Sequence, residues 1–341
     1  MRRRINISVL IHLLLSLVLV SSCTSVSFEN RSLASARHEE KRQVILTADD
    51  FGASENINRG IRRGIEAGVI NSVSAMVTFP GSVREICRLQ KDFPDVEIGL
   101  HLSISSGYPV SSPQDVPSLT GPGGGFHAID ELMCRLEGIS LEELEGELRK
   151  QINTLKDAGV PVRHLSSQHN ILGLYTPFFD VVLRLAEEYH IPLRSSVPVS
   201  VALDDFSTAK TRQRGRELAA RVIGKDIVSA MNLRKYASLE EMEKNQTRMN
   251  DLHIKHPDYL VDAFWGNPTP DNLFHILTHL PPGASEIVFH LGVNDNDLDA
   301  PHGIEGEYYL MRNYELYCVT SPELPRWLEL LNIEVIGFSD L

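Results

Sequence analysis

Short apolar runs alternate with amphipathic stretches along most of this 341-residue chain, and this alternation constrains the fold more than any other feature. The strand-like runs lie at 44–47, 73–77, 96–102, 163–167, 259–264, 287–290 and 333–336. The main helix-like stretches lie at 54–67, 83–89, 140–158, 177–189, 271–280 and 322–331. Strands that alternate with helices favour a parallel sheet. We therefore predict an α/β fold whose sheet is closed, or nearly closed, into a barrel.

Residues 1–22 have the features of an export signal and not of a folded domain. Arginines at positions 2–4 precede an almost unbroken apolar run at 9–20, which is too short for a spanning helix. Small residues then precede Cys23, as in a bacterial lipobox, which implies cleavage before Cys23 and a lipid anchor on its thiol. An ordinary secretory signal is the alternative. Both interpretations predict export, and the lipobox predicts anchoring to a bacterial membrane, on its periplasmic or cell-surface side.

The remaining chain divides into a tether and one folded domain. Residues 23–42 are rich in Ser, Asn, Arg and Glu and are expected to be flexible. Residues 43–341 are long enough for one barrel-sized domain, with a variable helical insertion near 197–255. Removing the three signal arginines from the net charge of −12 leaves −15 on the mature chain. Such acidity argues against nucleic acid as a partner.

Polar residues follow four of the predicted strands. Asp49 and Asp50 come after the first strand, His101 lies near the end of the third, and 164–170 and His290 close two others. The carboxyl ends of parallel strands meet at one face, so we predict that these clusters converge. A carboxylate with two imidazoles is a common ligand set for a catalytic divalent metal. Each cluster has a structural alternative, because an Asp pair can cap a helix and a lone His can belong to the core.

Other common catalytic motifs do not occur in the sequence. It contains no GxSxG elbow, and no cysteine has neighbours that suggest a nucleophile, which disfavours covalent catalysis. A Walker loop and a GxGxxG fingerprint are also missing, which disfavours nucleotide chemistry. A long loop at 105–126, dense in Gly, Pro and Ser, is predicted to be functional.

Several segments together resemble the YdjC-like carbohydrate deacetylase family. The resemblance implies an irregular (β/α) TIM-like barrel in a single catalytic domain. It also implies that a divalent metal is used to remove acetyl groups from N-acetylated sugars or oligosaccharides, especially chitooligosaccharides. The closing His290-Leu291-Gly292 departs from the usual His-Pro-Gly. The resembling segments are 46–52 with Asn58 and Gly60, 68–72, 98–102, 117–119 with 125–126, and 257–259 with Phe264, Gly266, 282–283, 285–286, His290 and Gly292.

Site roles follow from the resemblance and stay expectations here. Asp50 and His101 are implied to be metal ligands, and Asp49 the general base. A poor amine leaving group needs a proton, and His290 is the predicted general acid. Arg194 is expected to orient Asp49 or a sugar hydroxyl, with a surface ion pair as the ordinary alternative.

The third metal ligand is open between three residues. The family pattern His-x-Asp-Ser-His corresponds here to His164-Leu165-Ser166-Ser167-Gln168, which puts Gln168 at the ligand position when no gap is allowed. A slip of one residue restores His169, which we predict as the ligand. His164 is the remaining alternative.

The metal and the substrate are also open. One divalent ion is expected: the resemblance implies magnesium, whereas two imidazoles and a carboxylate suit zinc or another transition ion. Besides deacetylation of an N-acetylated sugar, the same metal–water attack could cleave O-acetyl esters on a glycan or amides on a peptidoglycan-derived sugar. Gln168 and Ser166 motivate a third possibility, a non-catalytic surface sugar-binding lipoprotein.

Overall fold

The computed structural model describes residues 41–195, 239–261, 267–294 and 306–341, with single positions at 220, 264, 301, 302 and 304. The predicted export signal, Cys23 and nearly all of the tether lie outside these residues, as does most of the predicted insertion before residue 239. Within the described part, no helix combines the length and the apolar character that crossing a membrane requires.

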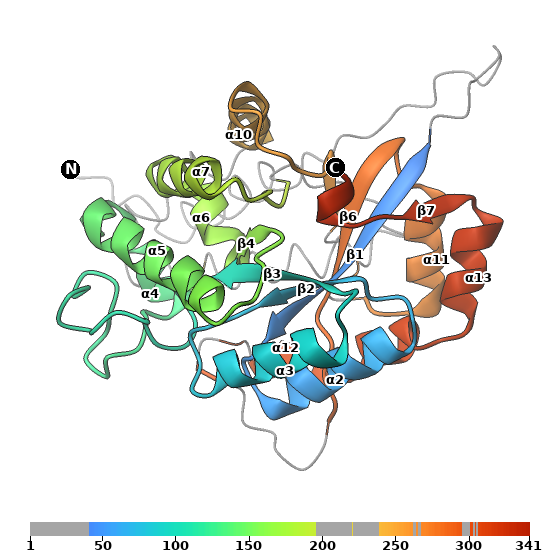
Figure 1. Ribbon diagram of the computed structural model, residues 1–341, viewed down its shortest axis with the longest axis horizontal. Helices are drawn as coiled ribbons and strands as arrows, with labels where there is room; N and C mark the ends of the chain where they lie inside the picture. Colours follow the sequence, from blue (N-terminus) through green and yellow to red (C-terminus); the bar gives the residue numbers. More distant parts are fainter. Residues whose placement is uncertain are drawn as a thin grey trace, which may run out of the picture.

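The described strands form one curled parallel sheet (Figure 1). The strands are β1 (Arg42–Phe51), β2 (Ser72–Ala75), β3 (Glu97–Leu102), β4 (Leu165–Ser167), β5 (Tyr259–Val261), β6 (Gly283–Phe289) and β7 (Ile333–Val335). Their order is β4-β3-β2-β1-β6-β5, and β7 pairs with β1 outside this path. The sheet corresponds to a half-barrel, and the predicted α/β class is confirmed.

Strand β1 is the centre of the sheet. Its residues from Val44 to Phe51 are all buried, as expected for a parallel strand covered on both faces. One edge of β1 is shared, because β7 pairs with residues 42–44 and β2 with residues 47–51. Asn71 fills the gap between them: its Oδ1 accepts from the Leu46 amide at 3.0 Å and its Nδ2 donates to the Ile336 carbonyl at 2.6 Å.

Helices cover the sheet on both sides (Figure 1). They are α2 (Glu55–Glu66), α3 (Ser82–Asp92), α4 (Ile129–Met133), α5 (Leu141–Asp157), α6 (Ile171–Leu174), α7 (Thr176–Tyr189), α10 (Leu239–Asp251), α11 (Pro270–Thr278), α12 (Gly306–Val319) and α13 (Glu323–Leu330). Helix α12 packs against α2, and α5 packs against α7. Six of these helices were predicted within a few residues; α12 was not, because its apolar and aromatic residues are spread around the helix.

Local sequence explains the best predicted helices. In α2, Ile57, Ile61 and Ile65 recur every four residues and are buried. The helix begins at a side-chain cap, because Ser54 Oγ accepts from the Ile57 amide at 3.2 Å.

The start of α5 has the Ser and Glu spacing of a capping box, but the box is only half formed. Ser140 Oγ accepts from the Glu143 amide. The Glu143 carboxylate, however, accepts from the amide and hydroxyl of Ser118, so it anchors the long loop and does not return to the cap.

Candidate functional site

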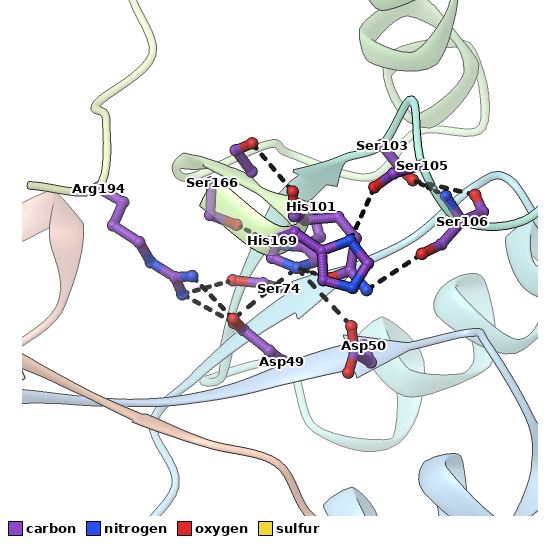
Figure 2. A network of polar contacts seen from close by, with 12 residues as sticks. Asp49, Asp50, Ser74, His101, Ser103, Ser105, Ser106, Ser166, His169 and Arg194 are labelled. Atoms are coloured by element: carbon purple, nitrogen blue, oxygen red, sulfur yellow. Dashed lines mark hydrogen bonds and ion pairs between the residues drawn. The ribbon is translucent and has the colours of Figure 1, made fainter. Parts of the chain in front are cut away.

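Polar residues from β1, β3 and the β4 end meet at the carboxyl edge of the sheet, where the sequence predicted them. Asp49 Oδ2 and Asp50 Oδ1 lie 3.8 and 3.7 Å from His101 Nε2, and all three side chains are buried. Figure 2 shows both carboxylates facing the His101 imidazole. The alternative that the Asp pair only caps the next helix is not supported, because Ser54 performs that role.

A bulge in β1 brings the two carboxylates to one side. Adjacent strand residues normally point to opposite faces of a sheet. The pairing with β2 shifts register between Asp49 and Phe51, and Asp50 has a φ of 74°. The extra residue turns Asp50 back toward His101. A left-handed conformation at a residue other than glycine costs roughly 1–3 kcal/mol and is typical of functional sites.

The His101 imidazole contacts polar groups from several parts of the cluster. Its Nδ1 lies 2.7 Å from Ser166 Oγ, and its Nε2 lies 2.8 Å from Gln168 Oε1. The Gln168 Nε2 group donates to Ser106 Oγ at 3.2 Å, which holds the amide with its oxygen toward the imidazole. The predicted placement of His101 at a strand end is confirmed, and its alternative as an ordinary core histidine does not account for the convergent oxygens.

Arg194 connects Asp49 to a second buried carboxylate. Its Nη1 and Nη2 donate to the two oxygens of Asp49, both at 2.7 Å, and its Nε and Nη2 donate to Glu286 at 3.0 and 2.9 Å. Burial alone would raise the pKa of Asp49, but the Arg194 charge, its hydrogen bonds and the nearby imidazoles together outweigh burial and hold that pKa well below the usual range. Asp49 is therefore fully ionised and fixed in orientation. Arg194 orients Asp49, and the surface ion pair considered for it is excluded by its burial.

Arg312 is the second buried cation of the site and binds Asp50. Its Nη2 donates to Asp50 Oδ2. Burial would raise the pKa of Asp50, but the Arg312 charge and the nearby imidazoles together outweigh burial and lower that pKa. Asp50 Oδ1 is buried and has no hydrogen-bond partner among the described residues. Asp50 thus presents one oxygen to the interior of the site while the other is neutralised.

His290 follows β6 and joins the site from the other side. Its backbone amide donates to Glu315 Oε2 at 2.6 Å, and its Nδ1 lies 3.9 Å from Glu315 Oε1. Burial, followed by the positive charge of Arg312, lowers the pKa of His290 to about 4. The imidazole is consequently neutral at pH 7.

The structure separates the three candidates for a third ligand. Gln168 contacts His101, whereas His169 has a φ of 55° and pairs through Nδ1 with Ser105 Oγ at 2.9 Å. His164 is fully buried, with Nε2 2.9 Å from Ser74 Oγ. Within the described residues, no set of three or more His, Cys, Asp and Glu side chains is arranged to hold a metal. His169 as a metal ligand therefore stays a prediction without support from these contacts.

Three charged site residues were missed by the sequence analysis. They are Glu286, Arg312 and Glu315. Glu286 carried a detectable signal, because a carboxylate inside a buried apolar strand needs a partner. Arg312 and Glu315 lie on α12, where an Arg and a Glu three residues apart are indistinguishable in sequence from a surface ion pair.

The long loop predicted to be functional is anchored over this site by α5. The Glu147 carboxylate is fully buried and accepts from the amides of Val110 and Ser111, both at 2.9 Å. Gln151 bonds the backbone of Ser103 through both ends of its amide. This anchoring explains how a segment without strands keeps the serines near His101 in place.

Comparison with known proteins identifies relatives along the whole domain. The YdjC-like protein family model matches residues 43–330. A carbohydrate deacetylase from Halalkalibacterium halodurans is 34% identical over 45% of this chain, and one from Brevibacillus brevis is 38% identical over 45%. These matches span 63% and 58% of the relatives' own lengths. A carbohydrate deacetylase from Clostridium beijerinckii matches over its whole length and 88% of this chain, at 24% identity.

One solved structure has the same fold. It is described as that of a putative cellobiose-phosphate cleavage protein from Enterococcus faecalis V583. It superimposes with a TM-score of 0.69 over 88% of this chain and 98% of its own, at 22% identity. At this identity the likeness supports the half-barrel architecture and carries no conclusion about chemistry.

Proposed function

We propose that this chain, which belongs to the YdjC-like protein family, is a carbohydrate deacetylase that hydrolyses the acetamide of an N-acetylated sugar. The observation that carries the proposal is the pair of buried carboxylates, Asp49 and Asp50, which both face His101 and are each held by a separate arginine. Named relatives that are carbohydrate deacetylases support the reaction class. A chitooligosaccharide is the substrate we favour.

The residues present fit a divalent cation beside Asp50 and His101. Asp50 Oδ1 is buried without a partner, and His101 Nε2 faces it across 3.7 Å. When bound, such an ion polarises the acetyl carbonyl and lowers the pKa of a water molecule toward neutrality. These two residues would hold it.

Asp49 is placed to accept the proton of the attacking water. Its low pKa makes it a weak base, so the proton transfer depends on a water that has already been acidified. Arg194 keeps both Asp49 oxygens aligned and prevents the carboxylate from turning away. Arg194 therefore fixes the orientation of the Asp49 carboxylate and also lowers its basicity.

His290 is the residue we assign to protonating the leaving amine. Because its pKa is about 4, it does not carry the needed proton from bulk solvent at pH 7. The proton that the amine receives is therefore the one that Asp49 takes from the attacking water, and His290 passes it to the amine nitrogen as the carbon–nitrogen bond breaks.

Acetate release from N,N′-diacetylchitobiose tests the proposal, with the chain from Thr24 onward measured with and without a chelator. We expect chelator-sensitive release. Asp49→Asn should reduce turnover by at least about 10³-fold and leave cation binding intact, since Asp49 acts on the water. The matched control Asp157→Asn, an exposed carboxylate on α5, should retain full activity.

Three outcomes would redirect the proposal. Loss of cation binding in Asp49→Asn would show that Asp49 is a ligand and not the base. Release of acetate from an O-acetylated glycan but not from the chitobiose would indicate an esterase. Folded protein that binds the disaccharide and hydrolyses neither would support the sugar-binding alternative.

A further inference from the structure

We propose that Gln168 completes a cation site with Asp50 and His101, so that this chain binds a hard, oxygen-preferring divalent ion and discriminates against zinc. The cation site is defined as Asp50 Oδ1, His101 Nε2 and Gln168 Oε1. This inference concerns the same site as the proposed hydrolysis, but it is tested by cation binding alone.

The first argument is the orientation of the Gln168 amide. Gln168 is buried, and its nitrogen is committed to Ser106 Oγ, so its oxygen points at His101 Nε2 from 2.8 Å. The next residue, His169, adopts a left-handed conformation and pairs with Ser105. The backbone at the end of β4 therefore presents the amide oxygen, and not the neighbouring imidazole, to His101.

The second argument is that the three atoms of the cation site cannot satisfy one another. A carboxylate oxygen and an amide oxygen are both acceptors, so the imidazole supplies at most one proton. If Nδ1 carries the proton and donates to Ser166, then all three atoms of the cation site are acceptors and none of them has a proton to share. If Nε2 carries it and donates to Gln168, Asp50 Oδ1 stays unpartnered while fully buried. Either tautomer leaves a buried acceptor that a cation would satisfy.

The third argument is the formal charge of the buried cluster. It contains four acidic side chains and two guanidinium groups, so the acidic groups outnumber the cationic groups by two. A buried charge without a partner is strongly unfavourable. A divalent cation supplies the missing charge. The members are Asp49, Asp50, Glu286, Glu315, Arg194 and Arg312, all at most 9% exposed.

The donor set determines which ion is preferred. Zinc favours nitrogen and sulfur ligands in a tetrahedral site, whereas magnesium and manganese favour oxygen ligands. Two oxygens and one imidazole are the harder set. The separations of 2.8 and 3.7 Å from His101 Nε2 are compatible with an ion whose ligands lie about 2.1 Å away, because neighbouring ligands are then roughly 3 Å apart or more.

Manganese(II) binding, followed by electron paramagnetic resonance on the full chain purified in detergent and stripped with a chelator, tests the site. We expect one ion per chain. Gln168→Ala should weaken binding at least about tenfold, and Gln168→Glu should keep or strengthen it, because it retains an oxygen ligand and adds charge. The matched control His169→Ala should change the affinity less than about twofold.

Competition with zinc tests the selectivity. Gln168→His should raise the ratio of zinc to manganese affinity by at least about tenfold. Three results would overturn the inference: loss of binding in His169→Ala, unchanged binding in Gln168→Ala, or no manganese binding by the folded wild-type chain. Acetate release is measured separately, so a chain that shows this binding pattern without hydrolysis would retain the cation site and lose only the proposed reaction.

Discussion

At the residue scale, the site depends on two arginines that each hold one carboxylate. Arg194 fixes both oxygens of Asp49, while Arg312 takes only one oxygen of Asp50 and leaves the other available. The two adjacent acids thereby acquire different environments. Such asymmetry between neighbouring carboxylates is how one site can assign a proton-transfer role to one and a ligand role to the other.

Replacing Arg194 tests how much of the fold depends on this network. Arg194→Gln leaves Asp49 and Glu286 buried without their cation, so we expect a loss of about 3–5 kcal/mol in the free energy of unfolding. Arg194→Lys keeps the charge but cannot make the paired contacts. Its free energy of unfolding should lie between those of the wild type and Arg194→Gln. The measurement is urea denaturation. The control is Arg184→Gln, an exposed ion pair with Glu145 that should cost less than about 1 kcal/mol.

Two histidines, the buried His164 and the partly buried His290, should make the fold sensitive to acid. Burial, with nearby Arg194 for His164 and Arg312 for His290, lowers both pKa values below the ordinary 6.5, to about 4 for His290. Between pH 4 and 6.5 the unfolded chain binds more protons, so the free energy of unfolding falls as the pH drops from 7 to 5. His290 alone should account for about 1–2 kcal/mol of this loss.

The check is denaturation at pH 7 and pH 5 with a chelator present, so that cation binding does not contribute. Asp49 and Asp50 do not contribute to the change in the free energy of unfolding between pH 7 and pH 5. Carboxylates with lowered pKa values lose their stabilising contribution only at more acidic pH. His290→Gln should show a smaller pH dependence, and His279→Gln, an exposed histidine, should behave like the wild type. Equal wild-type stability at both pH values would contradict the prediction.

At the element scale, helix α2 and the segment after β6 approach each other through two glycines. A Cβ placed on Gly60 would lie 2.5 Å from the backbone of Gly292, and the Val293 amide donates to the Asn56 carbonyl at 3.1 Å. Since Gly292 follows His290 by two residues, this contact positions the imidazole. The absence of a side chain at Gly60 therefore allows the close approach that positions His290.

Gly60→Ala should therefore damage both stability and activity. The added methyl meets backbone atoms that cannot rotate away, and we expect a loss of about 1–3 kcal/mol with reduced acetate release. Gly146→Ala on α5 is the matched control, because nothing lies within 4 Å of its Cβ position; it should be neutral or gain up to about 1 kcal/mol. Equal effects of the two substitutions in thermal denaturation would refute the role of the glycine contact.

At the scale of the whole molecule, the carboxyl edge of the sheet holds the site, and the contacts of the C-terminal segment contribute to stability. The site lies at the carboxyl edge, while the C-terminal segment packs elsewhere on the sheet: Glu97 accepts from the Phe338 and Ser339 amides at 2.6 and 3.0 Å. Phe338 also stacks on His164, with ring centroids 4.0 Å apart. These contacts stabilise the strands that carry the site without touching the carboxylate pair.

The position of the whole molecule in the cell is a separate prediction. If Cys23 is lipidated as the lipobox suggests, the full chain should be found in the membrane fraction and incorporate labelled fatty acid. Cys23→Ser should then lose the label and leave the membrane fraction. An exported wild-type protein without label would favour the ordinary secretory signal.

Much of the fold was predictable from local patterns. All seven strands and six of the ten named helices lie where the spacing of apolar residues indicated, because buried runs and four-residue periodicity are local properties. The convergence of Asp49, Asp50 and His101 also followed from their places at strand ends. What the sequence by itself determined was the α/β class and the strand ends that carry the chemistry.

Only the tertiary structure decided the electrostatics of the site. The bulge at Asp50 depends on how β1 pairs with β2. The pairing of Arg194 with two distant carboxylates and the approach of Arg312 from a helix near the C-terminus depend on contacts between residues more than 90 positions apart. That Gln168 and not His169 contacts His101 depends on the backbone conformation at one turn. Sequence spacing carries no information on such long-range pairings, because ion pairs and side-chain direction are set by which elements come together after folding.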